Sequence, residues 1–183
     1  FRRGRNQHQA LDALAFGIIR KKVNWVLDAD IRGFFDAIDH GWLMKFIEHR
    51  IADPRIHRLI QKWLKAGVLE QGTTTQTHAG VPQGATISPL LANILLHHVF
   101  DQWMSREHPG CPFERYADDV VIHCPSQEQA TTVRASVEAR LRQCKLETHP
   151  EKTQIVYCRD SNRKQEHDQV KFDFLGYGYQ PRK

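Results

Sequence analysis

The chain has 183 residues, of which 40% are hydrophobic and 26% are charged, a composition typical of one soluble globular domain. Its longest apolar run is far too short to span a membrane, and no signal peptide opens it, so we expect no membrane association. The net charge of +5 weakly favours a phosphate-rich partner. The four cysteines lack C-x-x-C spacing, which argues against a zinc site or a disulfide framework and favours a reducing, cytoplasmic setting.

The chain begins with an expected helix over 8–22, whose apolar residues recur at helical spacing and whose last turn is basic. The next segment, 24–31, alternates as a strand does, with Val26, Asp28 and Asp30 on one face. Asp30 therefore ends the predicted strand. Three other aspartates of this region are expected in turn, cap or surface roles rather than as ligands: Asp28, Asp36 and Asp39.

The segment up to residue 106 predicts, in chain order, a turn, two helices, a short hairpin and a long helix. The hairpin is inferred from two glycines and a threonine run. The long helix is expected to use Ser88 as its cap and Pro89 as its first residue. These elements are predicted over 33–38, 40–50, 54–65, 66–77 and 88–106.

The last third of the chain predicts more strands than helices. Residues 113–124, "FERYADDVVIHC", predict a hairpin that turns at residues 117–119. An amphipathic helix capped by Ser126, a strand–turn–strand unit and a final aromatic strand are predicted over 126–144, 145–158 and 171–179. The mixed order of helices and strands predicts an α+β domain, with a largely antiparallel sheet packed on helices.

The adjacent carboxylates of Asp118 and Asp119 are unusual in a strand-like segment. Aspartate is a poor strand residue, and two neighbouring carboxylates repel each other. Asp30 stands 88 residues earlier (118 minus 30), and we expect the three side chains to meet on the open sheet face. Such a cluster is costly unless it holds divalent cations, and hard oxygen ligands suit Mg²⁺. A solvated hairpin tip is the alternative interpretation of the aspartate pair taken by itself.

Several segments resemble, in order, the motifs of group II intron-encoded reverse transcriptases (maturases). "LDADIRGFFDAIDH" is similar to the first catalytic motif, and "YADD" is similar to the catalytic hairpin. "FRRGRNQHQAL" resembles the segment ahead of the first motif. "GVPQGATISPLLANILLHHVFD", "LETHPEKTQIVY" and "FDFLGYGY" resemble the second and fourth motifs and the fifth, called the primer grip. Retron enzymes and reverse transcriptases fused to CRISPR proteins share parts of this set, so they remain alternatives.

The resemblance implies a role for each matching residue. Asp30, Asp118 and Asp119 match the catalytic metal ligands, and Ile31 would add a backbone carbonyl. Lys152 matches a lysine that would assist the leaving pyrophosphate, with a surface lysine after a turn as the alternative. Phe35 matches the aromatic steric gate against ribonucleotides, with a core aromatic as the alternative. Nucleotide-binding roles are implied for Gln83 and Gly84, and primer or template contacts for Tyr116, Phe174, Leu175, Gly176 and Arg5. Arg115 is considered for a nucleic-acid contact too, with a solvated arginine as the alternative.

The implied fold is a polymerase palm with a core like that of an RNA recognition motif (RRM-like), extending over 1–183. Residues 1–24 and 40–80 would border the fingers, and most of the fingers and the thumb are expected outside this chain, which by itself would polymerise weakly or not at all. The implied activity is RNA-directed DNA synthesis with two Mg²⁺ ions, which Mn²⁺ can replace. The implied partners are an RNA template or intron RNA, a DNA or RNA primer and deoxynucleoside triphosphates. A non-catalytic RNA-binding module that assists splicing and an RNA-templated RNA polymerase are the alternatives.

Overall fold

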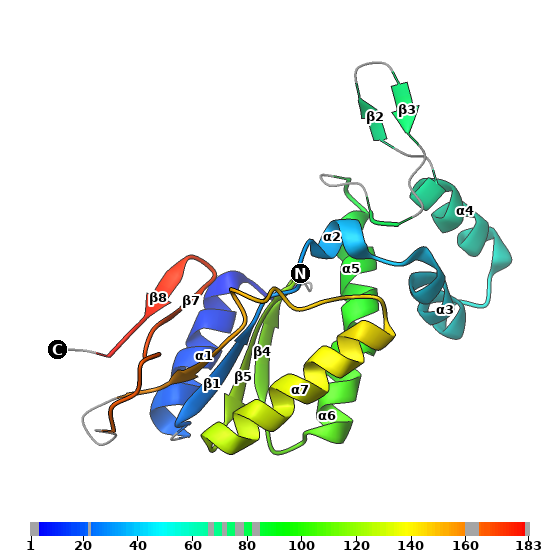
Figure 1. Cartoon of the computed structure of the whole chain (residues 1–183). Coiled ribbons are helices and arrows are strands. Elements are labelled where there is room, and N and C mark those ends of the chain that lie inside the picture. Colours follow the sequence, from blue (N-terminus) through cyan, green and yellow to red (C-terminus); the bar gives the residue numbers. More distant parts are fainter. Residues whose placement is uncertain are drawn as a thin grey trace.

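A computed structural model gives the arrangement of the elements (Figure 1). It describes residues 4–21, 23–65, 68–70, 73–75, 79–81, 85–159 and 165–181. A four-stranded antiparallel sheet forms the centre of the molecule. Its strands stand in the spatial order β4 (Phe113–Tyr116), β5 (Asp119–Cys124), β1 (Trp25–Ala29) and β6 (Gln154–Tyr157).

The chain order of these strands and their helices is that of a split β-α-β unit repeated, as in ferredoxin-like folds. This confirms the predicted α+β palm with its RRM-like core. A further helix, α1 (Gln7–Arg20), precedes β1. The other helices are α2 (Phe34–Ala37), α3 (His40–Arg50), α4 (Pro54–Lys65), α5 (Ser88–Leu96), the π-helical turn η1 (His97–Asp101), α6 (Gln102–Glu107) and α7 (Gln127–Gln143).

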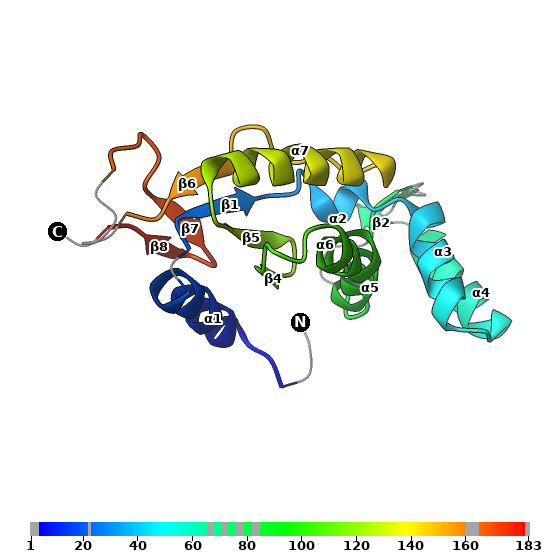
Figure 2. The ribbon, with the colours of Figure 1, turned by 90° about the horizontal axis from the view of Figure 1, so that it is seen from below.

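Alternating side chains of β1 and β5 supply two hydrophobic clusters on opposite faces of the sheet. Leu27 and Ile122 belong to the larger cluster, which includes the buried side of α7. Val26 and Val121 belong to the second cluster, together with Leu14 of α1. Figure 2 shows α7 and α1 on opposite sides of the sheet. We call the side that carries α1 the front face.

Helix α1 lies close against the front face. Its first turn is fixed by a capping box, in which Asn6 and Gln9 each accept a hydrogen bond from the other's backbone N–H. Further along, Gly17 lies over His123 of β5, whose side chain is buried. Burial, with a smaller contribution from Lys21, lowers the pKa of His123 to about 4. A neutral imidazole therefore packs under the helix at the point where the helix has no side chain.

The predicted long helix over 88–106 is divided into three segments. A π-helical turn, η1, separates α5 from α6. Ser88 is buried and is the first helical residue, whereas Ile87 occupies the N-cap position, so the prediction of Ser88 as the cap is wrong. Pro89 suits the first turn, where its missing N–H has no partner to lose.

Two strand predictions in the last third are also wrong. Residues 145–158 contain one strand, β6, because the first half of the segment contributes only a single bridge between Thr148 and Ile31. The final aromatic segment is a separate hairpin of β7 (Phe172–Phe174) and β8 (Tyr177–Tyr179). Its turn is made by Leu175 and Gly176, both with positive φ.

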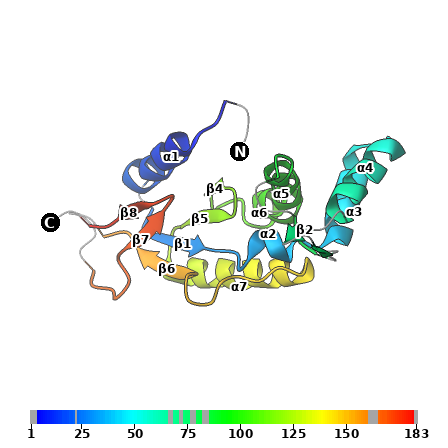
Figure 3. The same cartoon turned by 90° about the horizontal axis from the view of Figure 1, so that it is seen from above.

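The remaining features of the fold are a two-stranded hairpin, the outlying helices α3 and α4, and the cysteines. Within 66–77, β2 (Val68–Glu70) and β3 (Thr73–Thr75) form the expected hairpin. Figure 3 shows α3 and α4 away from the central sheet, at the opposite end from β8. The four cysteines are buried free thiols. Within the described ranges, no helix has both the length and the apolar character needed to cross a lipid bilayer.

The contact between α1 and β5 yields the first prediction. In Gly17→Ala the added methyl group would meet Cε1 of His123 at 2.5 Å. Overpacking of this kind costs about 1–3 kcal/mol and outweighs the gain of about 1 kcal/mol in helix propensity. We expect a lower urea midpoint for unfolding. Gly110→Ala is the control, because no atom lies within 4 Å of an added methyl there. A midpoint raised by Gly17→Ala would contradict the close contact.

Candidate active site

The register of β1 and β5 brings two of the predicted carboxylates together. Ala29 pairs with Val120 in this antiparallel ladder. Continuing the register by one residue places Asp30 opposite Asp119. Both residues continue the alternation that puts Val121 in the front-face cluster. The convergence expected for Asp30 and the hairpin therefore arises from strand pairing.

The hairpin between β4 and β5 turns tightly and adds a third carboxylate. Tyr116 pairs with Asp119, so that Ala117 and Asp118 form the turn. Ala117 has φ of 55°, a left-handed conformation that is costly for a residue with a side chain. Burial raises the pKa of both Asp118 and Asp119, and the negative charge of Asp30 adds to both shifts. These groups thus affect one another electrostatically.

Lys152 forms an ion pair with Asp30. Its ammonium nitrogen is 3.2 Å from Oδ2 of Asp30, although the lysine side chain is 66% exposed. The segment before β6 is anchored to the end of β1, because the His149 N–H donates to the Asp30 carbonyl at 2.7 Å. The lysine also lowers the pKa of Asp118 and Asp119, so its charge partly offsets the repulsion.

Asp28 is a fourth carboxylate on this face, and the expectation of a turn, cap or surface role for it is wrong. It lies inside β1, and its Oδ2 accepts a hydrogen bond from Gln154 at 3.2 Å. Burial raises its pKa to about 6, with additions from Asp119 and Asp30. The sequence contains a signal for this position, because the strand alternation places Asp28 on the same face as Asp30. Asp39, in contrast, caps α3 as expected by accepting from the Trp42 N–H.

The donor set can be compared with the needs of a magnesium site. Carboxylate and carbonyl oxygens are the ligands that Mg²⁺ prefers, and Asp30, Ile31, Asp118 and Asp119 offer them at adjacent strand ends. Through the described ranges of the chain, no three side chains of His, Cys, Asp or Glu are already gathered around one point as metal ligands. The type of ligand atom and the backbone positions of these residues therefore suit Mg²⁺. Their side chains are not arranged around a common point.

Phe35 packs against the edge of the larger hydrophobic cluster and lies beside the turn of the β4–β5 hairpin. It is partly buried in α2, while its neighbour Phe34 is fully buried. Phe35 and Ala117 line one crevice with Asn93 of α5. The Phe35 carbonyl accepts a hydrogen bond from the Val81 N–H at 2.8 Å. Gln83 and Gly84, the predicted nucleotide-binding residues, lie outside the described residues.

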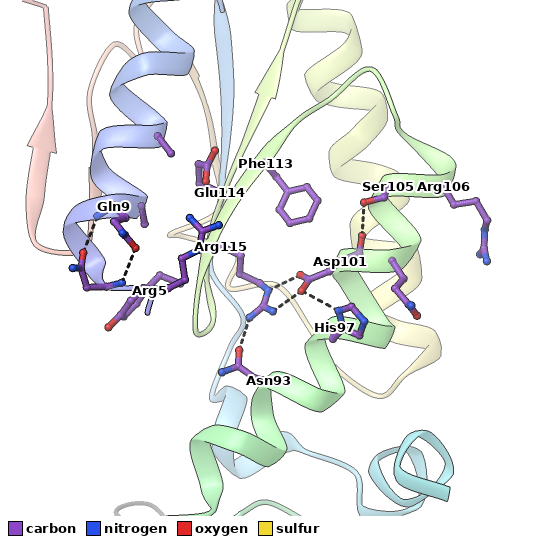
Figure 4. Close-up of a pocket in the computed structure, with 15 residues that line it drawn as sticks. Arg5, Gln9, Asn93, His97, Asp101, Ser105, Arg106, Phe113, Glu114 and Arg115 are labelled. Carbon is purple, nitrogen blue, oxygen red and sulfur yellow. Dashed lines mark hydrogen bonds and ion pairs between the residues drawn. The ribbon is translucent and has the colours of Figure 1, made fainter. Parts of the chain in front are cut away.

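The predicted primer and template residues are spread along the front face. Tyr116 ends β4 and packs on the second hydrophobic cluster, which also contains the buried ring of Phe174. Leu175 and Gly176 form the β7–β8 turn. Arg5 is exposed and lines a cleft of about 780 Å³ between α1 and the α5–α6 segment. Figure 4 shows this cleft, with Arg5 on its α1 side.

Arg115 does not have the exposed position that either sequence interpretation required. Its side chain is only 6% exposed and makes a bidentate ion pair with Asp101, at 2.6 and 2.7 Å. Figure 4 shows this pair at the back of the cleft. The guanidinium is thus occupied by partners within the protein and is not a free nucleic-acid contact.

Comparisons with known proteins agree with the fold and the motif order. The family model described as "Reverse transcriptase (RNA-dependent DNA polymerase)" matches residues 1–179. Protein YkfC of Escherichia coli (strain K12) is 29% identical over 219 residues, covering 97% of this chain and 53% of YkfC. The group II intron-encoded protein LtrA of Lactococcus lactis subsp. cremoris is 45% identical over 101 residues, covering 54% of this chain and 16% of LtrA.

The chain spans about half the length of YkfC and about a sixth of LtrA. Among solved structures, apo telomerase from Candida tropicalis, truncated from its C-terminal domain, superimposes with a TM-score of 0.68 at 15% identity. The match covers 93% of this chain and 37% of the telomerase chain, and at this identity it shows a shared fold. Because the family model extends over nearly all of its length, the chain belongs to the reverse transcriptase (RNA-dependent DNA polymerase) family.

Proposed function

We propose that this chain is the palm of an RNA-directed DNA polymerase of the group II intron type. The observation that carries the proposal is the register of β1 and β5, which, continued by one residue, sets Asp30 opposite Asp119 and next to the turn that contains Asp118. The similarity to LtrA, a group II intron-encoded protein, supports the intron type. The substrates would be a deoxynucleoside triphosphate and a DNA or RNA primer on an RNA template. Four buried free thiols fit the reducing conditions of the cytoplasm.

The carboxylates of Asp30, Asp118 and Asp119, with the Ile31 carbonyl, would hold two Mg²⁺ ions, which supply charge stabilisation for the attacking and leaving oxygens. The rest of the chemistry needed from the protein is positioning. Lys152 would donate a proton to the leaving pyrophosphate, and its ammonium nitrogen, 3.2 Å from Asp30, supports this role.

Selection of the sugar would depend on Phe35. Its position beside Ala117, at the catalytic turn, suits a flat ring beneath the incoming deoxyribose, where a 2′-hydroxyl would collide with it. Gln83 and Gly84 would contribute to nucleotide binding, as their match to the second motif implies. Phe174, Leu175 and Gly176 would support the primer end, with Tyr116 and Arg5 along the duplex path. Base pairing with the template, rather than side chains, would decide the sequence of the product.

A second candidate function is RNA binding without catalysis, as in an accessory splicing module. The observation that favours it is α4, which carries Arg55, Arg58, Lys62 and Lys65 and no acidic residue. Such a surface suits a phosphate backbone and needs no metal ion. A protein that only bound RNA would gain nothing from three mutually repelling carboxylates, so the polymerase remains the better supported function.

Replacing one carboxylate separates the two functions. In the full-length protein, we expect Asp118→Asn to abolish cDNA synthesis on a poly(rA)–oligo(dT) substrate, a loss of about 10³-fold or more, because a metal ligand is removed. RNA affinity, measured by fluorescence anisotropy, should be unchanged. Asp168→Asn, in an exposed loop, is the control. Synthesis that survives Asp118→Asn would exclude the proposed catalytic role.

Although Asp118→Asn should lose activity, it should be more stable than the wild type. A neutral amide at position 118 costs less to bury than a carboxylate and is not repelled by Asp30 or Asp119. With EDTA present, we expect the free energy of unfolding to rise by about 0.5–1 kcal/mol, a value reduced for solvent screening. Urea denaturation measures this change. A less stable variant would show that the carboxylate is satisfied by the fold itself.

The gate hypothesis predicts a change in sugar selectivity. We expect Phe35→Ala to raise kcat/KM for ribonucleotides relative to deoxyribonucleotides by about 10–100-fold, because the clash with the 2′-hydroxyl is removed. Single-nucleotide incorporation with dTTP and UTP gives the ratio. Phe16→Ala, which removes an exposed ring on α1, is the matched control and should leave selectivity unchanged. Equal sugar selectivity in Phe35→Ala and the wild type would show that Phe35 is a core aromatic and not a steric gate.

A further inference from the structure

The strongest unassigned feature is a partly buried polar network beside the β4–β5 hairpin. Arg115, on β4, is at its centre and donates to the two carboxylate oxygens of Asp101 at 2.6 and 2.7 Å. Its Nη1 also donates to Asn93 Oδ1 at 3.1 Å and to the Ala117 carbonyl at 2.8 Å. Figure 4 shows the contacts to Asp101 and Asn93, which join β4 to α5 and η1.

Asp101, the helical partner of Arg115, lies in an irregular helical turn. Asp101 is the last residue of the π-helical turn η1. Such a turn accommodates one extra residue and changes the direction in which the following side chains point. The preceding residue, Phe100, packs edge-on against Phe113 of β4, with ring centroids 5.1 Å apart. The aromatic contact and the ion pair thus fasten the same strand to the same turn.

The other end of the network reaches the catalytic turn itself. Ala117 directly precedes the aspartate pair and has the strained, left-handed φ of 55°. Its carbonyl is held by Arg115, and its side chain shares a crevice with Asn93 and Phe35. A conformation of this kind persists only where the surroundings fix it. The guanidinium supplies that constraint from within the same hairpin, two residues before the turn.

We propose that Arg115 is a positioning residue, which sets the conformation of the 117–119 turn and thereby the placement of the Asp118 and Asp119 carboxylates. The inference rests on the proposed polymerase function. Stability alone is a poor reason for the network, because a buried ion pair is often no more stabilising than apolar residues of similar volume. The network does, however, fix the orientation of Arg115 relative to Asp101, because a bidentate guanidinium–carboxylate pair requires a specific geometry.

The test replaces the ion pair with apolar residues and so avoids leaving an unpaired buried charge. In Arg115→Met combined with Asp101→Leu, we expect stability near that of the wild type, because both charges are removed. We expect kcat for dTTP incorporation to fall by about 10²-fold, the usual effect of an ångström-scale misplacement. KM for dTTP and affinity for the primer–template should be unchanged. The single variant Arg115→Lys keeps the charge but loses the bidentate geometry, so its kcat should not reach the wild-type value.

Amide hydrogen exchange provides a readout that does not depend on catalysis. In the double variant, residues 117–119 should exchange at least about tenfold faster, while the strands around them keep their protection. Arg134→Met with Glu138→Leu is the matched control, because it removes a 2.9 Å ion pair on α7 far from the turn. Wild-type exchange at 117–119, or wild-type kcat in a folded double variant, would overturn the positioning role. Both measurements use the full-length protein, in which an inactive wild type would instead reject the polymerase function, while the exchange data still decide the role of Arg115.

Discussion

The main constraint on the candidate site is the electrostatic repulsion between carboxylates that strand pairing brings close together. The register of β1 and β5 places Asp30 opposite Asp119, and the tight hairpin adds Asp118. Burial and mutual negative charge raise the pKa of both hairpin aspartates, so the folded protein carries an electrostatic cost at this edge. Lys152 offsets part of that cost. Divalent cations would offset more, which explains why a sequence would keep such a cluster in a structured strand end.

The rest of the fold supplies the stability that this edge lacks. One face of the sheet is covered by α7 and lies in a continuous hydrophobic cluster. The front face is divided along its length. Toward one end, α1 packs over Val26, Val121 and His123, with Gly17 allowing the close approach. Toward the other end, the same strands carry the carboxylates. A single sheet thus combines a packed half, which holds the strands in register, with a half left for chemistry.

Much of this arrangement could be predicted because it follows from strand alternation and from motifs in order. Alternation assigned the faces of β1, and the motif order joined Asp30 to the hairpin across a long stretch of sequence. The same alternation places Asp28 on the site face, whereas the general preference of aspartate for turns and caps favours a turn or surface role. The Ser88 cap failed for a different reason, since tertiary packing buried that side chain and moved the helix start. Local propensity does not contain this information.

The position of the 117–119 turn shows most clearly which structural information local sequence patterns lack. Among the described strands, β4 is at the edge of the sheet, so sheet hydrogen bonds hold the hairpin from one side, through β5. The other side must be fixed by a helix, and Arg115 provides that link through Asp101. The link exists because a π-helical turn directs Asp101 toward β4, and such a turn leaves no periodic signal in a sequence. An arginine beside an aspartate pair therefore suggests a nucleic-acid contact, whereas in the folded chain it belongs to the support of the site.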